Sequence, residues 1–63
     1  MKIQTRYYYE KVWRQTSEAE VLKIIIEEIG DADPQGTLRY IKEAISSGKS
    51  ITIGDCKLRK EED

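Results

Sequence analysis

The 63-residue chain contains no histidine, only one cysteine and no long apolar run. Without histidine it lacks the usual acid–base group at neutral pH and the commonest metal ligand. Cys56 alone cannot form an internal disulfide, and a lone cysteine without a signal-peptide pattern favours a cytoplasmic location. The apolar run 24–26 is far shorter than the ~20 residues that span a membrane. We therefore expect a small cytoplasmic protein with no membrane contact.

The same absences argue against an enzyme. Cys56 has no histidine to activate it, and so short a chain could barely enclose a pocket of ~300 Å³. Residues 31–36 imitate the start of a calcium loop, but Lys42 occupies the position where a bidentate glutamate is needed. We expect no catalytic residue, no metal and no cofactor, and an ordinary turn at residues 31–37.

Two helices are strongly indicated. Ser17 and Glu20 form a capping box, and Gly30 suits a helix end. Between them an apolar stripe recurs at helical spacing: Leu22, Ile25, Ile26 and Ile29. Val21 and Ile24 widen this stripe, so we expect the helix to be covered on more than one side. Asp33-Pro34 predicts a second helix start, and Gly48 its end. The buried side chains expected on this helix are Leu38, Ile41 and Ile45.

Residues 51–58 predict a β-hairpin that turns at Gly54-Asp55. A single straight strand would place Ile51 and Ile53 on one face with Asp55 and Lys57, which makes no core. With a two-residue turn, the four apolar side chains Ile51, Ile53, Cys56 and Leu58 share one face. The hairpin is therefore the better interpretation, and Cys56 should be buried.

Residues 2–14 contain no Gly, Pro, Asn or Asp, so they predict one long strand. The hairpin can pair with only about half of it, and an unpaired strand edge is unfavourable. We expect the stretch 6–14 to pair with a second copy in a homodimer. The alternative is a break near residues 9–11 that leaves a mobile or separately packed segment. The expected fold class is α+β, in the order β-α-α-β-β: a small antiparallel sheet with two helices on one face, forming one domain at 1–60 before an acidic tail at 61–63.

Alternation along this strand divides its side chains into two sets. Inward positions predict a dimer seam of Tyr7, Tyr9 and Trp13, because aromatic residues are common at such seams. The outward positions, with two basic residues of the hairpin, predict a surface for a ligand or partner: Arg6, Tyr8, Arg14, Lys57 and Arg59. Residues 1–14 are basic, whereas residues 15–33 are acidic, although the net charge is only −1.

These patterns favour a small non-catalytic regulatory or inhibitory protein, of the kind found among phage and mobile-element accessory proteins. It would bind another protein or a compact ligand through the basic and aromatic strand surface. The main alternative is a nucleic-acid-binding regulator of winged helix–turn–helix layout, with residues 34–47 as the recognition helix. A further alternative is a designed miniprotein, because the helix-capping residues, the hydrophobic periodicity and the turn residues all indicate the same structure.

Overall fold

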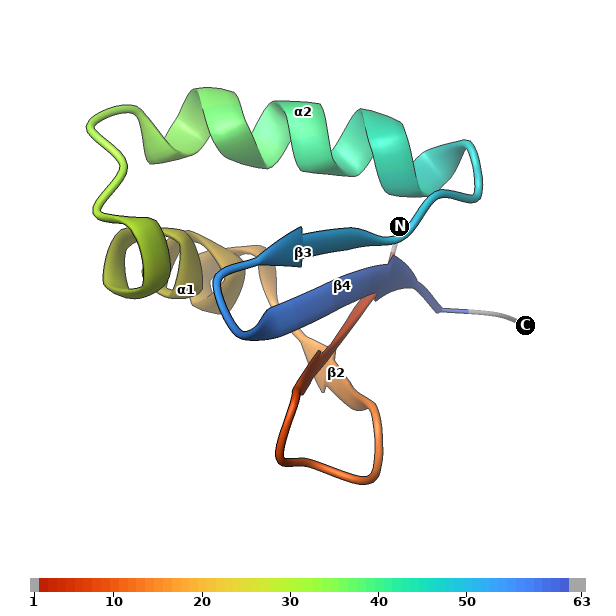
Figure 1. The fold of residues 1–63 in the computed structure, drawn as a ribbon. Coiled ribbons are helices and arrows are strands. Elements are labelled where there is room, and N and C mark those ends of the chain that lie inside the picture. Colours follow the sequence, from red (N-terminus) through yellow and green to blue (C-terminus); the bar gives the residue numbers. More distant parts are fainter. Residues whose placement is uncertain (1, 62–63) are drawn as a thin grey trace.

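Two helices cover one side of a four-stranded antiparallel sheet in the computed structural model, which describes residues 2–61 (Figure 1). Along the chain the elements are β1 (Ile3–Tyr7), β2 (Arg14–Thr16), α1 (Glu18–Ile29), α2 (Pro34–Ser46), β3 (Ile51–Ile53) and β4 (Cys56–Lys60). The strand order is β2-β1-β4-β3, so the two central strands come from opposite ends of the described chain. The α+β class, the antiparallel sheet and the position of both helices are confirmed. Of the expected acidic tail 61–63, residues 62–63 lie outside the described part.

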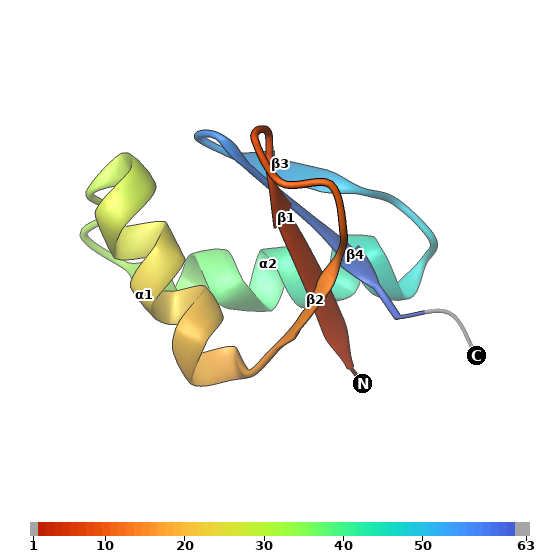
Figure 2. The same ribbon diagram turned by 90° about the horizontal axis from the view of Figure 1, so that it is seen from below.

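The single long strand predicted for residues 2–14 is wrong. Ile3–Tyr7 forms β1, the chain turns over residues 8–13, and β2 pairs antiparallel with β1 in the same molecule (Figure 2). The fold therefore begins with a hairpin, and its order is β-β-α-α-β-β. Because β2 covers the free edge of β1, strand length no longer gives a reason for a homodimer. The dimer stays an untested prediction.

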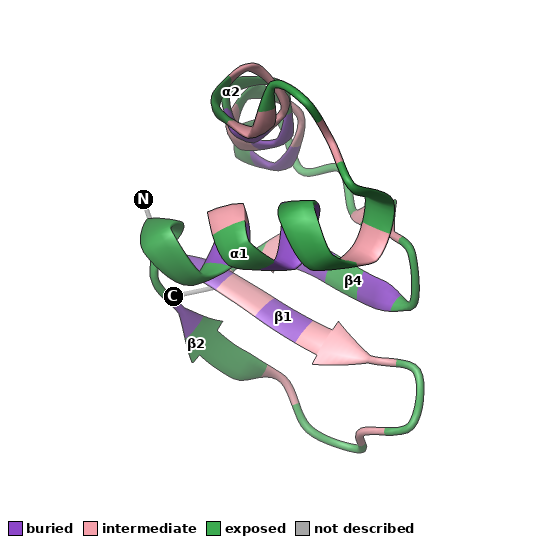
Figure 3. Cartoon of the chain, turned by 90° about the vertical axis from the view of Figure 1, so that its left-hand side faces the viewer, coloured by how far each residue is buried: buried purple, intermediate pink, exposed green. Residues whose placement is uncertain are grey.

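The core lies between the sheet and the helices. The side chains of β1 that face it are Ile3 and Thr5, and those of β4 are Cys56 and Leu58, all buried (Figure 3). The buried hydroxyl of Thr5 lies 2.6 Å from that of Thr16 in β2. Each of these polar atoms therefore has a hydrogen-bond partner inside the core, which removes the cost of burying it alone.

The C-terminal hairpin has the predicted register. Ile51 pairs with Leu58 and Ile53 with Cys56, and Gly54 has a φ of 57° in the turn. The amide of Asp55 donates to a carboxylate oxygen of Glu28 at 3.0 Å, so α1 holds this turn from the side. Apolar burial and the local turn chemistry favour the same register.

Both helices begin and end where the caps predict, but only part of the predicted apolar face of α1 is buried. The Ser17 hydroxyl accepts from the Glu20 amide, and Gly30 adopts the left-handed conformation at the end of α1. Val21, Ile24 and Ile25 are buried, whereas Ile26 and Ile29 are 52% and 50% exposed. Helix α1 is apolar over a wide arc, and periodicity alone could not show which part of that arc faces the sheet. In α2 the three expected side chains, Leu38, Ile41 and Ile45, are buried.

The link between the helices is a capped turn, as predicted. Asp33 accepts from the Gly36 amide, and Asp31 accepts from the Asp33 amide and from the Thr37 hydroxyl. The Thr37 hydrogen bond is the main cause that lowers the pKa of Asp31. Gly36 has a specific reason to lack a side chain, because a Cβ there would collide with the Asp33 carboxylate. No helix among residues 2–61 is long and apolar enough to cross a membrane.

The burial of Cys56 gives a first testable prediction. A thiol reagent should label the native protein at least about tenfold more slowly than the protein in denaturant, because reaction requires local opening. Burial also raises the pKa of the Cys56 thiol, so little reactive thiolate is present at neutral pH. The measurement is the rate of labelling at equal pH with and without denaturant. Equal rates would contradict the buried position.

Candidate functional site: the outer face of the sheet

The helices leave one side of the sheet uncovered, and this side carries the candidate site (Figures 1 and 3). Side chains alternate between the two faces of a strand, so the neighbours of the buried residues point away from the helices. We call this side the outer face. It consists of Gln4, Arg6, Trp13, Gln15, Thr52, Lys57 and Arg59.

Trp13 lies on the outer face between two arginines. The guanidinium carbon of Arg59 is 4.0 Å from the centre of the indole ring, and that of Arg6 is 5.5 Å away. Both distances fall in the range of cation–π attraction. Arg59 also donates from Nε to the side-chain oxygen of Gln4 at 2.9 Å. These contacts join β1, β4 and the segment before β2 on one surface.

The outer face is basic. Its seven side chains include three cations, Arg6, Lys57 and Arg59, and no carboxylate. Exposed acidic side chains such as Glu18, Glu20 and Glu27 lie on α1, on the other side of the sheet. The net charge is small because a basic outer face and an acidic helix side nearly cancel, as the uneven distribution of charge along the sequence indicates.

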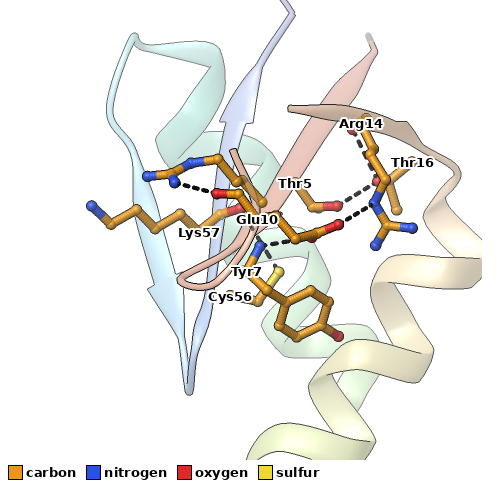
Figure 4. A network of polar contacts seen from close by, with 8 residues as sticks. Thr5, Tyr7, Glu10, Arg14, Thr16, Cys56 and Lys57 are labelled. Carbon is orange, nitrogen blue, oxygen red and sulfur yellow. Dashed lines mark hydrogen bonds and ion pairs between the residues drawn. The ribbon is translucent and has the colours of Figure 1, made fainter. Parts of the chain in front are cut away.

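Glu10 holds the turn between β1 and β2 (Figure 4). Its carboxylate accepts from the Tyr7 amide at 3.0 Å and forms an ion pair with Arg14 at 3.3 Å. Its amide donates to the Tyr7 carbonyl at 2.9 Å, and its own carbonyl accepts from the Arg6 guanidinium at 2.7 Å. No residue of β2 pairs with Tyr7, so the side chain of Glu10 supplies the acceptor for the Tyr7 amide.

Three tyrosines cluster at the start of this turn. The rings of Tyr7 and Tyr9 stack with their centres 5.5 Å apart, and the ring of Tyr8 meets that of Tyr9 edge-on at 5.3 Å. Tyr8 and Tyr9 are 72% and 68% exposed, whereas Tyr7 packs against the core. Burial is the main cause that raises the pKa of the Tyr7 hydroxyl. Stacking on Tyr7 holds Tyr9 against a ring that itself packs on the core.

The structure brings together only part of the predicted ligand surface. Arg6, Lys57 and Arg59 share the outer face, and Tyr8 follows Arg6 by two residues at the end of β1. Arg14 does not belong to this set: it pairs with Thr5, points to the helix side and contacts Glu10.

Trp13 lies on the opposite face from the one that alternation predicts. The turn over residues 8–13 inverts the phase of alternation, because odd residues of β1 pair with even residues of β2. Trp13 therefore joins Arg6 and Arg59 on the outer face rather than a seam with Tyr7 and Tyr9. Sequence reasoning also missed Gln4, whose position next to Arg59 depends on the register between β1 and β4.

The recognition-helix alternative finds little support in the surface of α2. Lys42, one of the two cations offered to DNA, forms an ion pair with Glu18 at 3.1 Å. Arg39, the second cation, lies beside Glu43 on the same surface, which is therefore close to neutral. Phosphate neutralisation supplies much of the affinity for DNA, and this helix offers little of it.

No protein-family model, curated protein or solved structure matches this chain.

Proposed function

We propose that this chain is a non-catalytic regulatory binding protein that holds an acidic protein partner on its outer face. The observation that carries the proposal is Trp13, fixed between Arg6 and Arg59 on the side of the sheet without helices. Tryptophan, tyrosine and arginine are the residues that most often dominate the binding energy of protein interfaces. The three cations of the outer face favour a partner that carries carboxylates there.

A protein partner fits the charge distribution better than a nucleic acid. The chain has a net charge of −1, whereas nucleic-acid-binding domains are generally basic overall. The acidic side chains of α1 would weaken long-range attraction of a polyanion, although a local contact to the outer face stays favourable. Single-stranded nucleic acid is nevertheless the natural competitor, since aromatic and arginine side chains also hold bases.

The test compares charge reversals on opposite sides of the sheet. Lys57→Glu changes the outer face, and Lys23→Glu makes the same change on exposed α1 as a matched control. Immobilised wild type, both variants and Trp13→Ala are exposed to a lysate of the source cells, and retained proteins are quantified by mass spectrometry. We expect an acidic partner that Lys23→Glu retains fully, while Lys57→Glu and Trp13→Ala each lose at least about tenfold of it.

Two results would contradict the proposal. One is equal recovery of the same proteins by Lys57→Glu and wild type. The other is a gel shift with single-stranded oligonucleotide that Trp13→Ala abolishes, in the absence of any selectively retained protein. That second result would assign the outer face to nucleic acid.

A further inference from the structure

The turn over residues 8–13 projects from the molecule at the end of the β1–β2 hairpin. It lies on the side of the sheet opposite α2 and reaches beyond the other elements there (Figures 1 and 3). Within residues 2–61, six large apolar or aromatic side chains are exposed, and three of them belong to this turn: Tyr8, Tyr9 and Val12, the last at 68%. Single exposed apolar side chains are normal, whereas such a concentration marks an interaction site.

Aromatic side chains lie on both faces of the hairpin at this end. Tyr7 packs against the core on the helix side, and the ring of Tyr9 stacks on it, so Tyr9 belongs to that side. Trp13, at the other end of the turn, lies on the outer face. A flat partner on the outer face would cover Trp13 and leave Tyr9 in water. A concave surface that receives the end of the hairpin covers both.

The turn is ordered before any partner binds. The Glu10 carboxylate accepts from the Tyr7 amide, and the Glu10 carbonyl accepts from the Arg6 guanidinium. Stacking on Tyr7 holds the ring of Tyr9. A loop that is already ordered loses little conformational freedom on binding, so more of the energy of its contacts contributes to affinity.

The charges around the turn suit a protein better than a lipid surface. The one carboxylate of the turn, Glu10, is engaged in an ion pair, and Lys11 is exposed. On the helix side, besides burial, the nearby carboxylates of Glu28 and Glu27 raise the pKa of the Tyr7 hydroxyl. Anionic headgroups would surround an inserted turn and meet these carboxylates. A protein can instead present carboxylates to the basic outer face and apolar groups to the tyrosines.

We infer that the turn over residues 8–13 inserts into an apolar cleft of the acidic protein partner and thereby excludes other ligands from that cleft. The inference rests on the proposed function, since the same partner contacts the outer face beside the turn. Tyr8, Tyr9 and Val12 fill the cleft, and Trp13 lies at its rim. Ligand sites are mostly apolar clefts, so a chain that fills one acts as a steric inhibitor.

The test introduces the photo-crosslinking amino acid p-benzoylphenylalanine at one position per variant, in place of Tyr9, Thr52 or Tyr40. Thr52 reports contact with the outer face, and Tyr40, 63% exposed on α2, is the matched aromatic control. Each variant is irradiated in a lysate of the source cells, and crosslinked peptides are identified by mass spectrometry. We expect the positions of Tyr9 and Thr52 to crosslink to the same acidic protein, and the position of Tyr40 not to.

The pattern of crosslinks separates this inference from the proposed function. A crosslink from the position of Thr52 without one from that of Tyr9 would overturn insertion of the turn and leave the outer-face contact intact. Equal crosslinking from the positions of Tyr9 and Tyr40 would also overturn insertion. No crosslink from either Tyr9 or Thr52 would overturn both proposals. Co-sedimentation of the wild type with phosphatidylglycerol–phosphatidylcholine vesicles, lost in Val12→Ser, would instead assign the turn to a membrane surface.

Side-chain truncation measures what the turn contributes. Val12→Ser should lower recovery of the crosslinked protein from the lysate at least about tenfold, whereas Tyr40→Ser should change it by no more than about twofold. Because Val12 is exposed, Val12→Ser should keep the melting temperature of the wild type, which separates lost contact from unfolding. Recovery equal to that of the wild type in both Val12→Ser and Tyr9→Ser would refute the inference.

A dye displacement assay tests whether a cleft is filled. The crosslinked protein is purified and loaded with the apolar dye 8-anilinonaphthalene-1-sulfonate. Saturating wild type should displace the dye and lower its fluorescence, whereas Val12→Ser at the same concentration should displace much less. Full dye fluorescence in the saturated wild-type complex would show that the turn occupies no apolar cleft.

Discussion

Replacing Gly54 with alanine should destabilise the protein by about 2–3 kcal/mol, from left-handed backbone strain of ~1–2 kcal/mol and loss of a hydrogen bond of ~1 kcal/mol. Gly54 has a φ of 57°, and an added Cβ would lie 2.9 Å from both Cβ and Oε1 of Glu28. Glu28 must then move, which breaks the hydrogen bond that the Asp55 amide donates to its carboxylate. Chemical denaturation measures the change in the free energy of unfolding.

Gly30→Ala is the matched control for this prediction. Gly30 has nearly the same φ, 58°, but an added Cβ would meet no atom within 4 Å. It should therefore cost only the backbone strain of about 1–2 kcal/mol. Equal losses of stability in the two variants would show that Glu28 does not support the hairpin turn. A larger loss for Gly54→Ala measures the contribution of the contact between α1 and the turn.

Replacing Glu10 with alanine should cost about 1–3 kcal/mol, since it leaves the partly buried Tyr7 amide without an acceptor. It also removes the ion pair with Arg14, whose side chain is 54% exposed, so solvent weakens this contribution. The turn over residues 8–13 should open, so the Tyr7 amide should exchange hydrogen faster and Trp13 fluorescence should shift towards that of a solvated indole. Denaturation, hydrogen exchange and fluorescence measure these effects.

Two further variants show which property of Glu10 matters. Glu10→Gln keeps a side-chain oxygen that can accept from the Tyr7 amide, so it should retain most of the stability that Glu10→Ala loses. Glu27→Ala removes an exposed carboxylate from α1 and should change stability by no more than about 0.5 kcal/mol. If Glu10→Gln is as unstable as Glu10→Ala, the negative charge rather than the hydrogen bond holds the turn.

Local signals predicted the helices and the second hairpin because they are complete within short stretches of sequence. Ser17, Gly30 and Asp33 each cap a helix with groups three or four residues away. The Gly54-Asp55 turn pairs apolar side chains only in one register. In these places local turn or capping chemistry and hydrophobic burial select the same structure.

The first hairpin could not be predicted in this way. Its turn uses no glycine, proline, asparagine or aspartate, and depends instead on the side chain of Glu10. That contact is local, three residues from the Tyr7 amide, but glutamate is not one of the residue types that mark a turn. The missed turn also affects the predicted site. A turn inverts the alternation of side chains, so Trp13 lies on the face opposite to the predicted one. Arg6, Lys57 and Arg59 do lie on one face, because the side chains of β1 and β4 alternate as predicted.

The exposed apolar side chains of α1 show the limit of periodicity. Ile25, Ile26 and Ile29 share the spacing of a buried stripe, yet only Ile25 of the three is buried, together with Val21 and Ile24. A helix with apolar residues on most of its circumference can rotate about its axis and still bury a similar area. Its contacts with both neighbours, rather than its own sequence, decide the rotation.

The strand order has a consequence for biosynthesis. β4 lies in the centre of the sheet, between β1 and β3, but it is the last of the described elements to be synthesised. Until β4 emerges, β1 and β3 have no common partner, and Ile3, Ile41 and Ile45 lack the cover of Leu58 and Cys56. Such long-range pairing slows folding and exposes apolar surface on the nascent chain. A premature stop before residue 56 would therefore leave a chain that aggregates or is degraded, not a smaller working domain.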